Sequence, residues 1–115
     1  MKIYLAGPMR GIKDFNFPAF FAAEEVLVAQ GHEVFNPARR DEEKHGNDVS
    51  KSETGDLAET VAKTGFNLRE ALAADAEWIC LHAEGIALLP GWEKSKGATA
   101  EKALSEALGH QVIYL

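Results

Sequence analysis

Short apolar runs alternate with longer helical patterns along this chain, and that alternation limits the folds open to it. The runs are "KIYLAG" at 2–7, "HEVFNP" at 32–37, "IALLP" at 86–90 and "QVIYL" at 111–115. Their length and apolar content predict buried strands. Strands that alternate with helices pair in parallel and are joined by right-handed crossovers. We therefore expect an α/β fold.

Helical patterns fill the intervals between these runs. One begins at a cap on Asn16 and stops at Gly31, another runs from a cap on Asn67 to a stop at Gly85, and a short one covers 57–64. The sequence therefore predicts a small doubly wound parallel sheet of four to five strands, in the order 2-1-3-4, with helices on both faces. Ligands of such sheets bind where the strand order reverses, at the carboxyl ends of strands one and three.

The whole chain, 1–115, has the size and composition of one domain, since 46% of its residues are hydrophobic. Residues 38–56 are charged and nearly free of large apolar side chains. That composition favours a mobile loop, whose positive residues would form a solvated lid.

Charge and cysteine content exclude several classes of protein. The net charge of -6 argues against a nucleic-acid or anionic-membrane binder, although a few local donors can still hold a small anion. Cys80 is alone, which excludes an intrachain disulfide and a cysteine-based zinc site and fits a reducing cytoplasm. The beginning of the chain is typical of neither a signal peptide nor a membrane span.

The four histidines share no common spacing along the sequence, so no metal site is expected.

Two carboxylates stand on helix faces that packing would fill with hydrocarbon. Glu101 is in line with Leu104 and Leu108. Asp75 interrupts an apolar stripe formed by Leu68, Leu72 and Ile79. Helical side chains lean toward the helix N-terminus, which points Glu101 at the predicted crevice. A buried carboxylate needs a partner or a function, although both residues could also be boundary positions that reach water.

Two acids in one crevice suit the cleavage of a glycosidic bond. One carboxylate stabilises or attacks the carbon on which positive charge develops, and a second carboxyl group protonates the leaving group. The turns "GPMRG" and "SKGA" add glycines, backbone amides and cations at strand-to-helix junctions, where phosphate binds well. The same glycines could serve only tight turns, and Ser95 could serve only as a helix cap. Neither turn is a P-loop or a dinucleotide fingerprint.

Four blocks, "YLAGPMRG", "FNFPAFFAA", "HEVFNPA" and "LLPGWEKSKGATAE", resemble the nucleoside 2-deoxyribosyltransferase superfamily, most closely an often phage-borne branch. The resemblance implies that Glu101 is the nucleophile, that Asp75 assists departure of the base and that Tyr4 orients Glu101. Ser95 matches a serine that binds the 5'-phosphate in the related 2'-deoxynucleoside 5'-monophosphate N-hydrolases, where the transferases commonly carry aspartate. Pro8 departs from that pattern, because a serine there contacts phosphate in the hydrolases.

We therefore expect cleavage or exchange of the N-glycosidic bond of a (deoxy)nucleoside 5'-monophosphate, without metal or organic cofactor. A non-catalytic nucleotide-binding or sensing module and a purely structural domain are the alternatives. The expected partners are a nucleotide or nucleoside and further copies of the chain, with Trp78 and the phenylalanines of the first helix at the interface. Trp92 either stacks on a base or caps the core. The expected substrate-binding residues are Gly7, Pro8, Met9, Arg10, Gly11, Asn36, Trp92, Ser95, Gly97 and Ala98.

Overall fold

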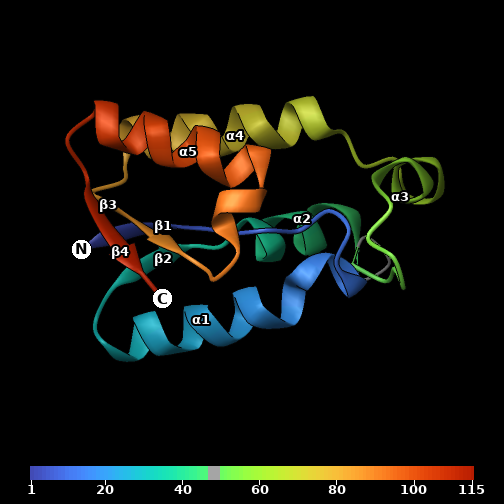
Figure 1. Cartoon of the computed structure of the whole chain (residues 1–115), viewed down its shortest axis with the longest axis horizontal. Helices are drawn as coiled ribbons and strands as arrows, with labels where there is room; N and C mark the ends of the chain where they lie inside the picture. The colour runs from blue at the N-terminus through green and yellow to red at the C-terminus, as the bar shows by residue number, and fades with distance from the viewer. Residues whose placement is uncertain (47–49) are drawn as a thin grey trace.

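The structure, a computed structural model, describes residues 1–46 and 50–115 and contains a four-stranded parallel sheet between two helical layers (Figure 1). The strand order β2-β1-β3-β4 confirms the predicted fold class and topology. The strands are β1 Lys2–Ala6, β2 Glu33–Phe35, β3 Gly85–Leu88 and β4 Gln111–Tyr114. Both neighbours of β1 pair with it in parallel, so the carboxyl ends of β1 and β3 meet at one edge.

The helices cover both faces of the sheet, as a doubly wound fold requires. In Figure 1, α4 and α5 lie on one face and α1 lies on the other. The helices are α1 Phe17–Ala29, α2 Pro37–His45, α3 Leu57–Thr64, α4 Leu68–Leu81 and α5 Lys96–Ala107, with short 3-10 turns at η1 Lys13–Asn16 and η3 Trp92–Lys94. Among the described residues, each helix is too short or too polar to cross a lipid bilayer.

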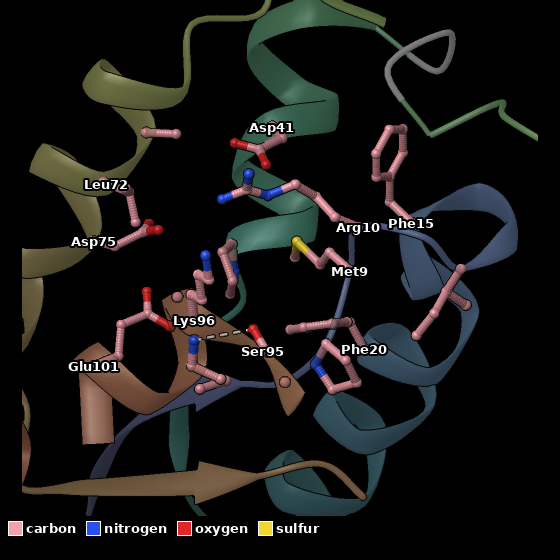
Figure 2. Close-up of a pocket in the computed structure, with 18 of the residues that line it drawn as sticks. Met9, Arg10, Phe15, Phe20, Asp41, Leu72, Asp75, Ser95, Lys96 and Glu101 are labelled. Atoms are coloured by element: carbon pink, nitrogen blue, oxygen red, sulfur yellow. Dashed lines mark hydrogen bonds between the residues drawn. The ribbon is translucent and has the colours of Figure 1, made fainter. Parts of the chain in front are cut away.

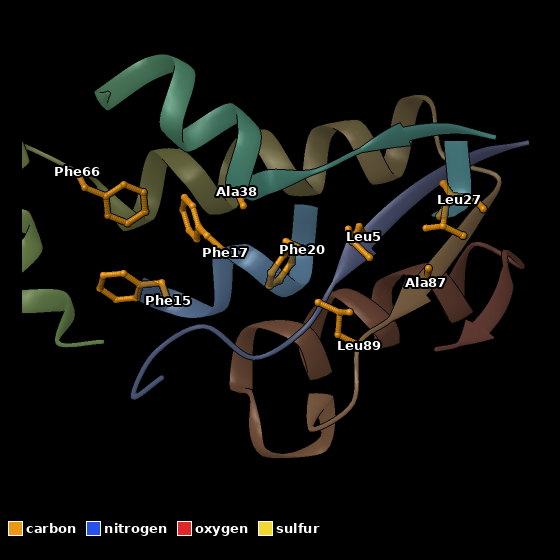
Figure 3. Packing of buried hydrophobic residues seen from close by; sticks show 10 residues of the cluster. Leu5, Phe15, Phe17, Phe20, Leu27, Ala38, Phe66, Ala87 and Leu89 are labelled. Carbon is orange, nitrogen blue, oxygen red and sulfur yellow. The ribbon is translucent and has the colours of Figure 1, made fainter. Parts of the chain in front are cut away.

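Alternate side chains of β1 enter two separate cores. Leu5 packs with Phe17 and Phe20 of α1 in the cluster that Figure 3 shows. Tyr4 packs on the opposite side with Ile79 of α4, because successive strand residues point to opposite faces. Tyr4 therefore faces the α4–α5 layer. Phe17 and Phe20 are buried in the core of the chain itself, so the prediction that they form an interface is wrong.

The prediction of a loop over residues 38–56 is wrong for its first part, which forms the helix α2. The Asn36 side chain accepts a hydrogen bond from the Ala38 amide at 2.9 Å and caps this helix, and Pro37 occupies the first turn. Ala38 and Asp41 of α2 are buried, so this helix packs against the rest of the chain. The remainder of that predicted loop includes residues 47–49, which lie outside the described residues.

Two predicted element ends and one predicted helix cap also differ from the structure. β2 ends at Phe35 because Asn36 already caps α2, and α4 ends at Leu81 because Gly85 begins β3. Asn16 precedes α1 as predicted, but it does not cap the helix through its side chain. Its Nδ2 instead donates a hydrogen bond to the carbonyl of Pro8 at 3.0 Å, which ties the loop after β1 to the start of α1.

The loop after β1 is strained and is held by the segment that precedes α3. Asp14, Phe15 and Asn16 have left-handed backbone angles, with φ of 52°, 51° and 63°. For residues with a Cβ this conformation costs about 1–2 kcal/mol each. The Asp14 amide donates to the Ser52 carbonyl at 2.6 Å, and the Asp14 carboxylate accepts from the Ser52 amide at 3.1 Å. These contacts fix the loop at the mouth of the crevice.

Gly55→Ala is expected to lower the free energy of unfolding by about 2 kcal/mol or more. The φ of Gly55 is +69°, and an added Cβ would lie 2.5 Å from the backbone oxygen of Ile12, in the strained loop. Urea unfolding measures the loss. Gly65→Ala is the matched control, because its φ is +75° but nothing lies within 4 Å of the added Cβ. Equal losses in the two variants would show that the Gly55 contact with the loop contributes nothing.

Candidate active site

A cavity of about 670 Å³ lies at the carboxyl ends of β1 and β3, where the topology predicts a ligand site. This volume is within the range of about 300–1,000 Å³ that is common for small-molecule sites. Figure 2 shows Asp75 and Glu101 on one side of the cavity, with Arg10 on the other side and Lys96 between them. The cavity brings together most of the expected site residues, namely Tyr4, Gly7, Pro8, Met9, Arg10, Asp75, Ser95, Gly97, Ala98 and Glu101.

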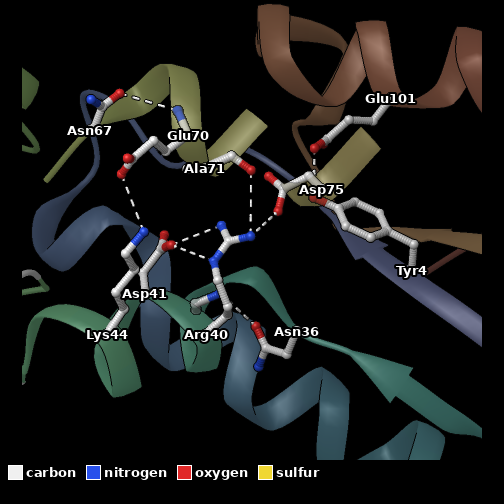
Figure 4. Close-up of polar contacts among 11 residues, drawn as sticks. Tyr4, Asn36, Arg40, Asp41, Lys44, Asn67, Glu70, Ala71, Asp75 and Glu101 are labelled. Atoms are coloured by element: carbon white, nitrogen blue, oxygen red, sulfur yellow. Dashed lines mark hydrogen bonds and ion pairs between the residues drawn. The ribbon is translucent and has the colours of Figure 1, made fainter. Parts of the chain in front are cut away.

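Glu101 reaches the cavity from the second turn of α5 and is held by Tyr4. The Tyr4 hydroxyl donates a hydrogen bond to Glu101 Oε2 at 2.5 Å, across 97 residues of sequence. Tyr4 is 1% exposed, so its ring has little room to move. Tyr4 therefore aims one oxygen of the Glu101 carboxyl group and leaves the other for a partner or a ligand (Figure 4).

Burial and a neighbouring charge shift the titration of Glu101. Desolvation, followed by the negative charge of Asp75, raises the pKa of Glu101 from 4.5 to about 8, although the hydrogen bond from Tyr4 lowers it. Burial, followed by the charge of Glu101, likewise raises the pKa of Tyr4 well above its ordinary value. Without a ligand, Glu101 therefore holds its proton at pH 7.

Asp75 is buried on α4 and pairs with a cation that the sequence analysis had placed in a solvated lid. Arg40 Nη1 lies 2.6 Å from Asp75 Oδ1, and Arg40 Nη2 lies 2.8 Å from Asp41 Oδ1. Burial raises the pKa of the Asp75 carboxyl group, and the charge of Arg40 opposes that rise. The site thus contains a cation and two further carboxylates beside Glu101.

Arg40 and Asp41 are the site residues that the sequence analysis missed. The available signal was the pair Asn36–Pro37, which is typical of a helix start and would have placed Arg40 on the first turn of a helix. A second signal was Asp75 itself, because a buried carboxylate requires a partner of opposite charge. Further missed residues form an apolar wall of the cavity, namely Ile12, Phe15, Leu57, Phe66, Leu68 and Leu72.

The opening of the cavity combines the start of α5 with basic side chains. Ser95 Oγ accepts a hydrogen bond from the Ala98 amide at 3.1 Å and caps α5, while its hydroxyl proton remains available to a ligand. The first amides of a helix have no partner within the helix and favour anions. Arg10, Lys94 and Lys96 also line the cavity. This end of the site therefore suits a negatively charged group.

Three of the expected substrate-binding residues are not among those that line the cavity. Asn36 caps α2, and its Nδ2 donates to Glu24 Oε2 at 2.8 Å. The Gly11 amide donates to the Gly55 carbonyl at 3.0 Å. The Trp92 ring lies 6.0 Å from that of Tyr114 and packs against the core, which favours the core-capping alternative over base stacking.

A comparison with protein-family models finds one family that matches nearly the whole chain. The model of a family described as "Domain of unknown function (DUF4406)" matches residues 1–114. The chain belongs to this family. No curated protein and no solved structure matches it. The description of this family states no activity.

The site of this DUF4406 domain suits acid–base or nucleophilic chemistry on an anionic ligand. Glu101 and Asp75 are carboxyl groups whose pKa values are both raised, and such perturbed pairs are concentrated at functional sites. Within residues 1–46 and 50–115, no group of three or more histidine, cysteine, aspartate or glutamate residues is arranged to hold a metal ion.

Proposed function

We propose that this DUF4406 domain cleaves or exchanges the N-glycosidic bond of a (deoxy)nucleoside 5'-monophosphate. One observation carries the proposal: a half-buried Glu101, aimed by the Tyr4 hydroxyl at 2.5 Å, lines the same cavity as the buried Asp75. Glycosidic cleavage uses a pair of carboxyl groups in this way. The resemblance of four sequence blocks to the nucleoside 2-deoxyribosyltransferase superfamily supports the same reaction.

The carboxyl pair would divide the work between sugar and base. The Glu101 carboxylate attacks C1' of the sugar as the C1'–N bond breaks, and its charge stabilises the oxocarbenium character of the transition state. A proton delivered to the departing base prevents a poor leaving group from carrying negative charge. Water then releases the sugar from Glu101 and completes hydrolysis, or a second base takes its place and completes transfer.

The cavity opening supports a 5'-phosphate on the substrate. The Ser95 hydroxyl, the start of α5 and the side chains of Arg10 and Lys96 offer donors and positive charge. An aspartate in place of Ser95 would repel a phosphate dianion. We therefore infer that the enzyme prefers nucleotides to nucleosides. Homo-oligomerisation and a cytoplasmic setting remain predictions.

The proposed function is tested by incubating the purified protein with a panel of ribonucleoside and deoxyribonucleoside 5'-monophosphates and the matching nucleosides. Chromatography separates free base and sugar phosphate from substrate. We expect release of free base from at least one nucleotide, with the matching nucleoside cleaved more slowly. A second free base in the mixture distinguishes transfer from hydrolysis. A complete panel without base release or base exchange would contradict the proposal.

A non-catalytic nucleotide-binding module is the second candidate, and one observation favours it. Glu101 with a pKa of about 8 is largely protonated at pH 7, and a protonated carboxyl group is a poor nucleophile. This module would bind nucleotides without turnover at any pH. The enzyme would instead show base release with a pH optimum, because the reaction needs one ionised carboxyl group to attack C1' and one proton for the departing base.

Ser95→Asp is expected to reverse the preference for nucleotides. Aspartate caps helices as well as serine does, so the start of α5 is retained while a negative charge enters the phosphate end. We expect the dissociation constant for the nucleoside 5'-monophosphate to increase at least tenfold, with little change for the nucleoside. Calorimetric titration measures both. Ser95→Asn is the neutral control, and an equal loss in both variants would show that charge at this position is not what selects phosphate.

A further inference from the structure

Arg40 connects the carboxyl pair to helix α2. Its side chain is 21% exposed, and its Nη1 contacts Asp75 Oδ1 at 2.6 Å. Its Nε donates to Asp41 Oδ1 at 2.9 Å, and Nη1 also donates to the Ala71 carbonyl of α4 at 3.4 Å. Figure 4 shows the guanidinium between the two aspartates, with Tyr4 and Glu101 beyond Asp75. Arg40 thus contacts Asp75 on the side away from Glu101.

The position of Arg40 is fixed by packing as well as by charge. Its guanidinium carbon lies 5.6 Å from the centre of the Phe35 ring. The Phe35 ring is held in turn by Tyr4 at 5.6 Å and by Trp78 at 5.1 Å between ring centres. Because Tyr4 also aims Glu101, one aromatic stack positions the cation and the candidate nucleophile together.

We propose that Arg40 is a positioning residue that keeps Asp75 ionised, so that the single proton of the carboxyl pair resides on Glu101 before a nucleotide binds. Two ionised carboxylates in a buried site repel each other strongly, and such pairs share one proton. Asp75 has a guanidinium at hydrogen-bond distance, whereas Glu101 has the hydroxyl of Tyr4. The stronger partner therefore stabilises the charge on Asp75.

The other charged groups around the pair agree with this assignment. If Glu101 is neutral, the buried cluster contains one cation and two carboxylates, and ionisation of Glu101 adds a third negative charge to it. The direction of the pKa shifts agrees with this assignment. Burial raises the pKa of both carboxyl groups, and Asp75 adds to the rise at Glu101, whereas Arg40 opposes the rise at Asp75 through its charge and a hydrogen bond but at Glu101 through its charge alone. The titratable and charged groups around the pair come from every side of the cavity. They are Tyr4 from β1, Arg10 from the loop after β1, Arg40 and Asp41 from α2, with His45 acting on Asp41, and Lys94 and Lys96 at the start of α5.

For the reaction, the assignment changes the role of Asp75, and this consequence rests on the proposed function. Asp75 first accepts the proton of Glu101, which makes Glu101 a carboxylate. A Glu101 oxygen then bonds to C1', the C1'–N bond breaks with its electron pair on the base nitrogen, and Asp75 gives the proton to that nitrogen. Water later adds its oxygen to C1', the ester bond to Glu101 breaks, and the proton of the water returns to the pair. Asp75 is thus a proton carrier that starts in the basic form.

The test follows the titration of Glu101 and Asp75 by ¹³C NMR of their carboxyl carbons, in protein without nucleotide. Glu101→Gln and Asp75→Asn assign the two signals by their disappearance. In the unsubstituted protein we expect Glu101 to ionise last. In Arg40→Gln we expect the order to reverse, because Asp75 loses its cation while Glu101 retains Tyr4. In Arg40→Lys, which preserves the charge, we expect the original order.

One control variant tests whether loss of any cation from α2 changes the titration order, and a second variant without Arg40 guards against misfolding. Lys44→Gln removes a cation from the same helix, where Lys44 pairs with exposed Glu70 at 3.2 Å, and is expected to leave the order unchanged. Arg40→Gln leaves two buried carboxylates without their cation, which disfavours folding. Arg40→Gln/Asp41→Asn, which removes a cation and an anion together, is therefore measured beside it with the same expected reversal. Glu101 still ionising last in every folded variant without Arg40 would overturn the inference.

Activity gives an independent measure of the same assignment. If base release is observed, the acid limb of the kcat/KM profile should move to higher pH in the folded variant without Arg40, because Asp75 must be a carboxylate to accept the proton of Glu101 and loses the cation that lowers its pKa. Arg40→Lys should restore the original profile. An unchanged pH profile would also overturn the inference. A reversed NMR titration order without base release from any nucleotide would support the role of Arg40 and contradict the proposed function, so the two can fail separately.

Discussion

Glu101→Gln is expected to lower the rate of base release by about 10³-fold or more, because an amide cannot attack C1' as a carboxylate does. Glutamine has the same shape, and its side-chain oxygen can still accept the hydrogen bond that Tyr4 donates to Glu101 at 2.5 Å. The cavity should therefore keep its form, and the dissociation constant for the nucleotide should change little. Initial rates by chromatography and binding by calorimetry measure the two effects.

The matched control is Glu106→Gln on the same helix. Glu106 forms an exposed ion pair with Lys102 at 2.9 Å and lies outside the residues that line the cavity. We expect this variant to release base at the rate of the unsubstituted protein. A Glu101→Gln enzyme that retains more than a tenth of that rate would exclude Glu101 as the nucleophile, whatever the reaction.

Glu101→Gln is also expected to stabilise the protein, by an amount that grows with pH. The pKa of Glu101 is about 8 in the folded protein, against 4.5 for an ordinary glutamate. Below the ordinary value, both states hold the proton and its contribution to stability is fully present. As pH rises from there toward about 8, the unfolded chain loses the proton while the folded chain retains it, so the contribution is lost at up to about 1.4 kcal/mol per pH unit.

Glutamine has no proton to lose, so the variant should gain about 3–4 kcal/mol over the unsubstituted protein between pH 5 and pH 8. Urea unfolding at pH 5, 6, 7 and 8 measures the difference in the free energy of unfolding. Glu106→Gln should show the same pH dependence as the unsubstituted protein. A difference between Glu101→Gln and the unsubstituted protein that does not change with pH would mean that Glu101 ionises normally in the folded state.

Much of the candidate site followed from local pattern. Glu101 and Asp75 were identifiable because each interrupts an apolar helical stripe, and helix geometry pointed Glu101 at the crevice. The strand order was identifiable because parallel strands joined by helices admit few arrangements. Those two facts already place both carboxylates in one cavity, where the structure has them.

Helix α2 and its arginine were not identifiable in the same way. The segment is strongly charged and shows no apolar stripe, so the hydrophobic pattern gave it no reason to be ordered. Its order comes from tertiary contacts, including the pair between Arg40 and Asp75, which are separated by 35 residues. Trp92 illustrates the converse, since its place in a loop near the crevice suggested a ligand contact, but its ring packs against Tyr114.

The amino-acid sequence by itself determined the α/β topology and the carboxyl groups at its crevice, because both follow from periodicities that each segment carries alone. Only the tertiary structure decided which of those carboxyl groups holds the proton. That property depends on burial and on charges brought within a few ångströms of each other, and Arg40 reaches Asp75 at 2.6 Å only after α2 packs against α4. The charge distribution of the site is therefore a property of the folded chain.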